Sequence, residues 1–317
     1  MKLQTKIPIE KEKYNQIDYN SNVVLLGSCF AENVGEKFDY FKFKSAVNPF
    51  GILFHPLAIE SLITRAINSD YYETSEVQAV NEHYVCYDAH SRMNTTEPSD
   101  LVLKLNSALD QTLEQLQDAT HVIITLGTSW VYRHIANDAI VANCHKVPQK
   151  EFLKELLSVD EIKASLQAIV SLVRAINSKL SFIFTVSPIR HIKDGFVENT
   201  LSKSHLVSAI HQVVDIRHQL YYFPSYEIMM DELRDYRFYK DDMVHPSKQA
   251  IDYIWERFVD CWVTEDTLPT MKEIDAIQKG LSHRSSKVEG LENVKFQKQL
   301  LSKIESITAK FPHIIFN

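Results

Sequence analysis

The chain has few of the residues that mark special structural sites. Its 317 residues include only four cysteines, and no two of them form a Cys-x-x-Cys pair. Such spacing argues against a zinc knuckle and against a disulfide framework, and it is typical of a reducing compartment. The chain also lacks an apolar run of about 18 residues and an N-terminal signal sequence, so we expect a cytoplasmic protein without a membrane span.

Motifs for nucleotide cofactors are missing as well. No Gly-x-Gly-x-x-Gly or Walker sequence follows the first apolar run, which argues against nicotinamide, flavin and ATP chemistry. The net charge of -7, from 34 basic and 41 acidic residues, argues against a nucleic-acid partner. We therefore expect no cofactor, no metal and no nucleic acid.

What the chain does have is an alternation of short apolar runs and amphipathic helices. Strands are predicted at 23–26, 41–47, 122–126, 180–186 and 220–223. Helices are predicted at 31–38, 55–68, 99–119, 158–178, 198–217 and 246–263. The alternation predicts an α/β domain over 1–263, in which helices cover both faces of a parallel five-stranded sheet. Excursions from this core are expected near 70–98 and 133–157.

The last part of the chain, 264–317, differs in character. It is rich in lysine and serine, with a polar break at 282–290 and a predicted helix at 291–309. We interpret it as a helical arm that packs on the domain or on a second subunit, through which a homodimer could form.

Polar or glycine-containing turns follow four of the predicted strands. They lie at 28–29, 48–51, 127–130 and 187–190. In parallel α/β sheets, ligands bind at the carboxyl ends of the strands. These four turns are therefore expected to meet at one edge of the sheet and to form a site.

Ser28 directly follows the first strand and precedes a helix. The N–H groups and the dipole at a helix N-terminus favour negative charge, which suits a nucleophile beside an oxyanion. The alternative is that Ser28 only caps the helix. His245 lies three residues after Asp242 and could be oriented by it, as a catalytic base requires, or it could belong to an ordinary surface turn.

Taken together, these segments resemble the GSCFA family, which is grouped with the SGNH/GDSL hydrolases. The motifs are Gly-Ser-Cys-Phe-Ala at 27–31, the segments 126–132, 143–148, 187–190 and 222–227, and Asp-x-x-His-Pro at 242–246. The resemblance covers roughly residues 20–260 and implies a flavodoxin-like three-layer α/β/α fold.

The resemblance also implies roles for single residues. Ser28 would be the nucleophile, Asp242 the orienting acid and His245 the base. The N–H groups of Ser28 and Gly51 would form part of the oxyanion hole. Most relatives take a third donor from Gly-x-Asn-Asp, where this chain has Gly-Thr-Ser-Trp at 127–130. The third donor is then the Ser129 hydroxyl or an amide of Asn48 or Asn143.

Other residues near these turns have alternative interpretations. Cys29 adjoins Ser28, where the helix start would lower the pKa of its thiol, so a thiol nucleophile is the nearest rival. Cys144 and His145 could form a dyad or bind a metal, although a loop packed against the site is favoured. Trp130, Tyr132, His145 and Arg190 are candidates for substrate binding or for plain packing. His205 falls within a predicted helix and is expected to be structural.

We therefore predict a serine esterase that removes an acyl group from a carbohydrate or another small-molecule ester. An acyltransferase using the same residues, or an inactive binding module with this fold, are the alternatives. We expect Ser28 Oγ within about 3.5 Å of a His245 ring nitrogen. Asp241 is expected to face solvent.

Overall fold

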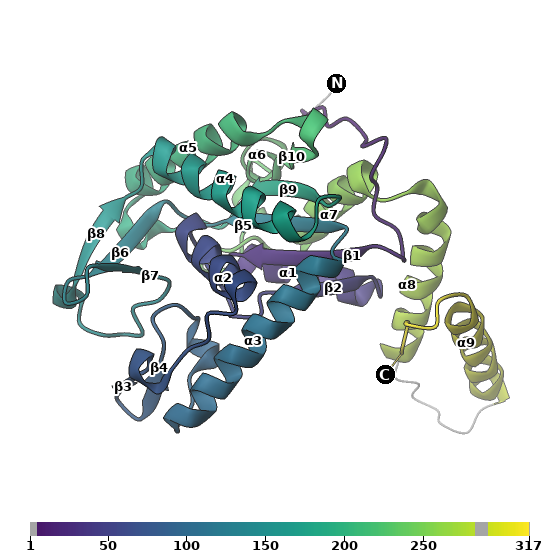
Figure 1. Cartoon of the computed structure of the whole chain (residues 1–317). Coiled ribbons are helices and arrows are strands. Elements are labelled where there is room, and N and C mark those ends of the chain that lie inside the picture. The colour runs from purple at the N-terminus through teal and green to yellow at the C-terminus, as the bar shows by residue number, and fades with distance from the viewer. Residues whose placement is uncertain (1–4, 283–290, 317) are drawn as a thin grey trace.

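A single parallel sheet forms the centre of the molecule. The computed structural model describes residues 5–282 and 291–316, and the sheet has the strand order β10-β9-β5-β1-β2 (Figure 1). The strands are β1 (Asn22–Gly27), β2 (Lys44–Val47), β5 (His121–Leu126), β9 (Ser181–Val186) and β10 (Leu220–Tyr222). All adjacent pairs are parallel, so the predicted five-stranded α/β sheet is confirmed.

Helices cover both faces of this sheet. One face carries α2 (Pro56–Asn68), α3 (Pro98–Asp118), α4 (Val159–Ile176) and α5 (Phe196–Val213). The other face carries α1 (Cys29–Tyr40) and α7 (Lys248–Trp262). A short helix, α6 (Ser225–Glu227), and a π-turn at Ile228–Glu232 follow β10. The result is the expected three-layer α/β/α arrangement.

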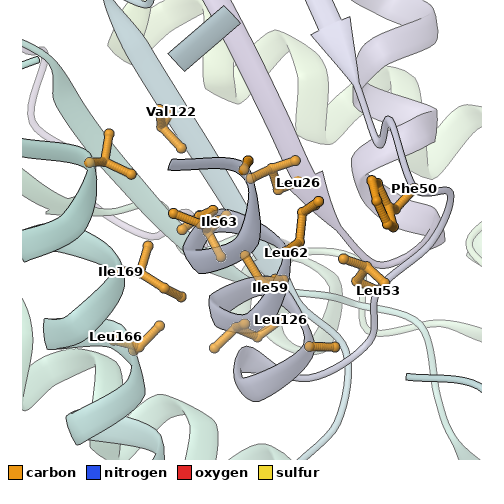
Figure 2. Close-up of a cluster of buried hydrophobic side chains, with 14 of the residues drawn as sticks. Leu26, Phe50, Leu53, Ile59, Leu62, Ile63, Val122, Leu126, Leu166 and Ile169 are labelled. Atoms are coloured by element: carbon orange, nitrogen blue, oxygen red, sulfur yellow. The ribbon is translucent and has the colours of Figure 1, made fainter. Parts of the chain in front are cut away.

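Successive side chains of β1 point to opposite faces, and both faces are apolar. Val24 and Leu26 belong to the core under α2 and α4, whereas Val23 and Leu25 belong to the core under α1 and α7. Figure 2 shows the first of these cores, where α2 and α4 place their apolar side chains against the sheet. Burial on both faces explains why the strands appear in the sequence as unbroken apolar runs.

The two excursions contain short strands that the sequence analysis did not predict. The first holds a hairpin of β3 (Gln78–Val80) and β4 (His83–Val85). The second holds an antiparallel sheet of β6 (Trp130–His134), β7 (Ala139–Val141) and β8 (Phe152–Leu156).

The described residues of the C-terminal segment form two α-helices, where one was predicted. They are α8 (Leu268–Ser282), which was not predicted, and α9 (Leu291–Lys310). Met271, Ile274 and Ile277 of α8 are buried in the core shared with α1 and α7. Residues 283–290 of the predicted polar break lie outside the described residues.

The segment before β1 pairs with the segment after α7. Ile17 forms a parallel bridge with Val263, and its N–H donates to the Trp262 carbonyl at 2.7 Å. The N–H of Thr264 donates in turn to the Ile17 carbonyl at 3.1 Å. Two parts of the chain that are far apart in sequence are therefore paired with each other. Within the ranges that the structure describes, no helix is long and apolar enough to cross a bilayer.

Candidate functional site

The strand order reverses direction at β1. The chain places β2 on one side of β1 and β5 on the other, so the connections leave the sheet edge in opposite directions. Such a reversal opens a crevice at the carboxyl ends of the strands. The turn after β1, which carries Ser28, lies at this crevice.

Ser28 is the N-cap of helix α1, and hydrogen bonds with backbone groups hold it in place. Its Oγ accepts a hydrogen bond from the N–H of Phe30 at 3.3 Å, and its N–H donates to the Thr125 carbonyl at 2.9 Å. The residue is fully buried, with 0% of its surface exposed. The capping role that the sequence offered as an alternative is therefore present, whether or not Ser28 also acts in chemistry.

Glycines on two neighbouring strands allow the close packing around Ser28. Gly27 has φ +130°, and a Cβ there would overlap the carbonyl oxygen of Thr125 on β5. A Cβ on Gly127 would lie 3.2 Å from Ser28 Cβ, 3.2 Å from His191 Nε2 and 3.2 Å from the Phe54 carbonyl oxygen. These three groups therefore lie close to Gly127, and a larger residue there would require them to move by a few tenths of an ångström.

Asp242 and His245 form a hydrogen-bonded pair in the turn before α7. Asp242 Oδ2 lies 2.7 Å from His245 Nδ1, and its Oδ1 accepts from the N–H groups of Val244 and His245 at 2.9 Å each. These hydrogen bonds lower the pKa of Asp242 to about 2, the backbone donors contributing most. The carboxylate is therefore ionised at neutral pH, and it orients the imidazole so that Nε2 is left for another partner.

The turn differs from the prediction at Pro246 and agrees with it at Asp241. The helix begins at Lys248 with Ser247 as its N-cap, so Pro246 is not in the first turn; it forms a bridge with Tyr239 instead. Asp241 is exposed, as expected.

The turn after β9 connects the two parts of the site. The N–H of Arg190 donates to the Val244 carbonyl at 3.2 Å, which ties this turn to the Asp242–His245 turn. The next residue, His191, places its ring against Gly127, and Ser28 lies against the same glycine. Among the described residues, no hydrogen bond joins the Ser28 hydroxyl to the His245 imidazole, so that contact stays a prediction.

Two predicted oxyanion donors are already engaged in local hydrogen bonds. The N–H of Gly51 donates to the Asn48 carbonyl at 2.8 Å, and the Ser129 hydroxyl donates to Ser202. Asn143 is held through its acceptor, since its Oδ1 accepts from the His145 N–H. In Asn48 the Oδ1 accepts from the Gly27 N–H at 2.8 Å, and the Nδ2 is buried without a partner.

A cavity of about 440 Å³ lies between the turns after β5 and β9 and the β6-β7-β8 sheet, and Ser28 is not among the residues that line it. His191, Phe54 and Thr128 belong to its lining, together with three of the predicted substrate-binding residues. These three are Trp130, Tyr132 and His145. Arg190, the fourth, points elsewhere, because its guanidinium lies 4.0 Å from the centre of the Tyr239 ring. A larger cleft, of about 1010 Å³ between α1, α7 and α8, includes none of the predicted site residues.

The cysteines near the site do not favour thiol chemistry. Burial raises the pKa of Cys29, contrary to the lowering expected from its place at the helix start. Burial also raises the pKa of Cys144, to about 11. The described part of the chain holds no group of three or more side chains that could bind a metal ion. His205 donates from Nδ1 to the Leu157 carbonyl at 2.7 Å, a contact that ties α5 to the end of β8.

Lys203 and His191 are two residues that the sequence analysis did not select. The Lys203 ammonium is buried on α5 and donates to the carbonyls of Gly127 and Ser187, at 2.7 Å each, where β5 and β9 end. Lys203 lies in the middle of a helix, so no local signal points to it. His191 directly follows the predicted turn 187–190, and that position at a strand end was the available signal.

One of two comparisons relates the chain to known proteins. A search of curated proteins found no match. A family model matches most of the chain, from residue 22 to residue 258, and this span includes Ser28, Asp242 and His245. The protein therefore belongs to the GSCFA family.

Proposed function

We propose that this protein is a serine ester hydrolase of the SGNH/GDSL type. The observation that carries the proposal is the Asp242–His245 pair, with 2.7 Å between carboxylate and imidazole, on the turn that is tied to the loop beside Ser28. An imidazole held at Nδ1 by an ionised carboxylate is the base that a serine nucleophile needs.

The reaction follows from these three residues. Ser28 Oγ attacks the ester carbonyl, and His245 Nε2 takes the hydroxyl proton. The tetrahedral intermediate then collapses to an acyl-Ser28 ester, and His245 delivers the proton to the leaving alcohol. Water, activated by His245 in the same way, releases the acid and restores Ser28. Asp242 stays ionised and holds the imidazole in one tautomer throughout.

The intermediate carries a negative oxygen that needs hydrogen-bond donors. The N–H groups of Ser28 and Gly51 already donate to carbonyls, which does not favour them in this role. The Asn48 amide is the better candidate, since its Nδ2 is buried without a partner and its Oδ1 is held next to Ser28 by Gly27. We propose Asn48 as an oxyanion donor.

The 440 Å³ cavity suits a carbohydrate or another small polar ester. Trp130 and Tyr132 offer aromatic surface against which a sugar ring can pack, and His145 and Asn143 offer polar groups for hydroxyls. Because Ser28 is fully buried and does not line this cavity, an ester reaches Oγ only after side chains have shifted. His191 is one such side chain, since it lines the cavity and its Nε2 lies against Gly127.

A fluorophosphonate probe tests the proposal directly. We expect mass spectrometry to find the probe on Ser28, and p-nitrophenyl acetate or acetylated sugars to be hydrolysed. Ser28→Ala should lose labelling and turnover, whereas the matched variant Cys29→Ala should keep both. A folded Cys29→Ala protein that is inactive would indicate a thiol hydrolase, and a wild-type protein that neither labels nor turns over would indicate an inactive binding module.

A further inference from the structure

The ring nitrogen Nε2 of His191 is buried and has no hydrogen-bond partner. The residue itself is held firmly: its N–H donates to the Asn199 side chain at 2.8 Å, and its ring packs edge-on against Phe54 with 5.6 Å between the ring centres. A buried polar atom without a partner costs free energy, so such an atom at a candidate active site calls for a functional explanation.

This nitrogen points to the space next to Ser28. The position of a Cβ on Gly127 is 3.2 Å from His191 Nε2 and 3.2 Å from Ser28 Cβ, so both atoms border the same small space. His191 also lines the 440 Å³ cavity from which a substrate would approach. The imidazole therefore borders both the cavity and the space at Gly127 that Ser28 also borders.

The backbone donors around this space are engaged elsewhere. The N–H groups of Gly127 and Thr128 both donate to the Phe54 carbonyl, at 2.8 and 3.1 Å, and that of Ser28 donates to Thr125. The negative oxygen that forms on the ester carbonyl when Ser28 attacks would find no free backbone N–H among these three groups. Side-chain donors have to replace them.

The His191 imidazole is neutral at physiological pH. Burial lowers its pKa to about 3, and the nearby Lys203 and His245 side chains lower it further. A neutral imidazole with its proton on Nε2 is a hydrogen-bond donor and a poor proton acceptor. Neutral imidazoles serve other enzymes as donors to developing negative charge.

We propose that His191 is a further catalytic residue, which donates its Nε2–H to the oxyanion formed when Ser28 attacks an ester. It would act together with the Asn48 amide and would replace the backbone donors that are engaged. This inference rests on the proposed function of Ser28, Asp242 and His245.

Three substitutions at one position test the inference. His191→Gln keeps an N–H donor near the position of Nε2, and we expect it to retain activity within about tenfold of the wild type. His191→Leu removes the donor and should lower kcat by about 10²–10³-fold with little change in KM. His191→Glu has the length of glutamine but carries no donor when ionised, and it should be at least as impaired as His191→Leu.

Binding of phenylboronic acid, which forms a tetrahedral adduct with a serine, gives a second measurement. The affinity should fall in His191→Leu and be recovered in His191→Gln. His211→Leu makes the same change at an exposed position of α5 and should leave kcat and affinity unchanged. Thermal melting of each variant shows that it is folded.

The outcomes separate this inference from the proposed function. If Ser28→Ala is as active as the wild type, both are overturned. If Ser28→Ala is inactive but folded His191→Leu equals the wild type, only the role of His191 is overturned. If His191→Glu is active and His191→Gln is not, His191 accepts a proton rather than donating a hydrogen bond, and the inference is again overturned.

Discussion

The two parts of the candidate site are built in opposite ways. Ser28 is fully buried at the end of a central strand, whereas the side chains of Asp242 and His245 are 48% and 41% exposed in a surface turn. Around Ser28, a glycine with positive φ, a capped helix and the buried Lys203 determine the backbone. Around His245, three hydrogen bonds to a single carboxylate do so.

Because of this difference, whether a substitution lowers stability or only activity depends on which of the two parts it changes. Changes near Ser28 should act on the stability of the fold as well as on the reaction. Changes in the Asp242–His245 turn should act on the reaction alone, because the turn has little buried surface to lose.

The largest expected effect is that of Asp242→Asn on turnover. The amide can no longer hold the imidazole in the required tautomer, so kcat should fall by about 10²–10⁴-fold while the melting temperature hardly changes. Ester hydrolysis and thermal melting measure the two quantities. Asp241→Asn, at the exposed neighbour, is the control and should be fully active. A large loss of stability in Asp242→Asn would contradict the distinction between the two parts.

Gly27→Ala should have an effect of comparable size in free energy, but on the stability of the fold rather than on kcat. The residue has φ +130°, and its new Cβ would overlap a carbonyl oxygen of the next strand. We expect the free energy of unfolding in urea to fall by about 3–5 kcal/mol. Gly195→Ala is the matched control, since Gly195 also has positive φ (+116°) but its Cβ would meet only the movable side chain of Glu198. Equal losses of unfolding free energy in the two variants would mean that the overlap with the Thr125 carbonyl oxygen adds nothing to the effect of the positive φ.

Lys203, in the buried part, should make the free energy of unfolding depend on pH. Burial lowers the pKa of its ammonium to about 7 in the folded protein, while the unfolded chain keeps the ordinary value of about 10.4. Between these values the unfolded chain holds a proton that the folded protein has released, so the free energy of unfolding rises with pH over this window. We expect a gain on the order of 1–3 kcal/mol between pH 7 and pH 9.5.

Lys203→Met should lack this part of the rise. Urea unfolding of both proteins at the two pH values gives the difference directly. Identical pH dependence in the two proteins would show that the lysine stays charged in the folded state.

The smallest effect is expected from removing α9, which belongs to neither part of the site. Of its described apolar side chains, Leu300 and Ile307 are buried while Val294 and Leu301 are about half exposed. Ending the chain at Ser282 should lower the melting temperature by about 5 °C and leave kcat unchanged. Gel filtration would show whether the truncation also changes the oligomeric state. No change in either property would mean that α9 contributes nothing to the fold or to assembly.

The sequence predicted the sheet better than it predicted the excursions. Strands such as 122–126 are buried on both faces, and their unbroken apolar runs and glycine ends are visible without a structure. The strands of the excursions have three to five residues and are half exposed, so they leave no clear period. Helix α8 was missed because its buried residues are spread among charged ones.

In the candidate site, too, only contacts between residues close in the sequence could be predicted. The Asp242–His245 hydrogen bond could be predicted because the two residues are three positions apart in one turn. The engagement of the Gly51 N–H and the Ser129 hydroxyl could not, because each depends on where the fold places a partner. His191 and Ser28 come together only through the packing of β1, β5 and the turn after β9.

The pairing of Ile17 with Val263 has a consequence for biosynthesis. Residues 5–21 are made before the α/β domain, yet their partner is made only after nearly all of that domain has been translated. At 5–20 residues per second, they wait on the order of tens of seconds. The His245 turn is also made late, so a nascent chain would carry Ser28 long before it carried His245. The proposed esterase activity would then appear only when translation of the domain is complete, and its onset would report on co-translational folding.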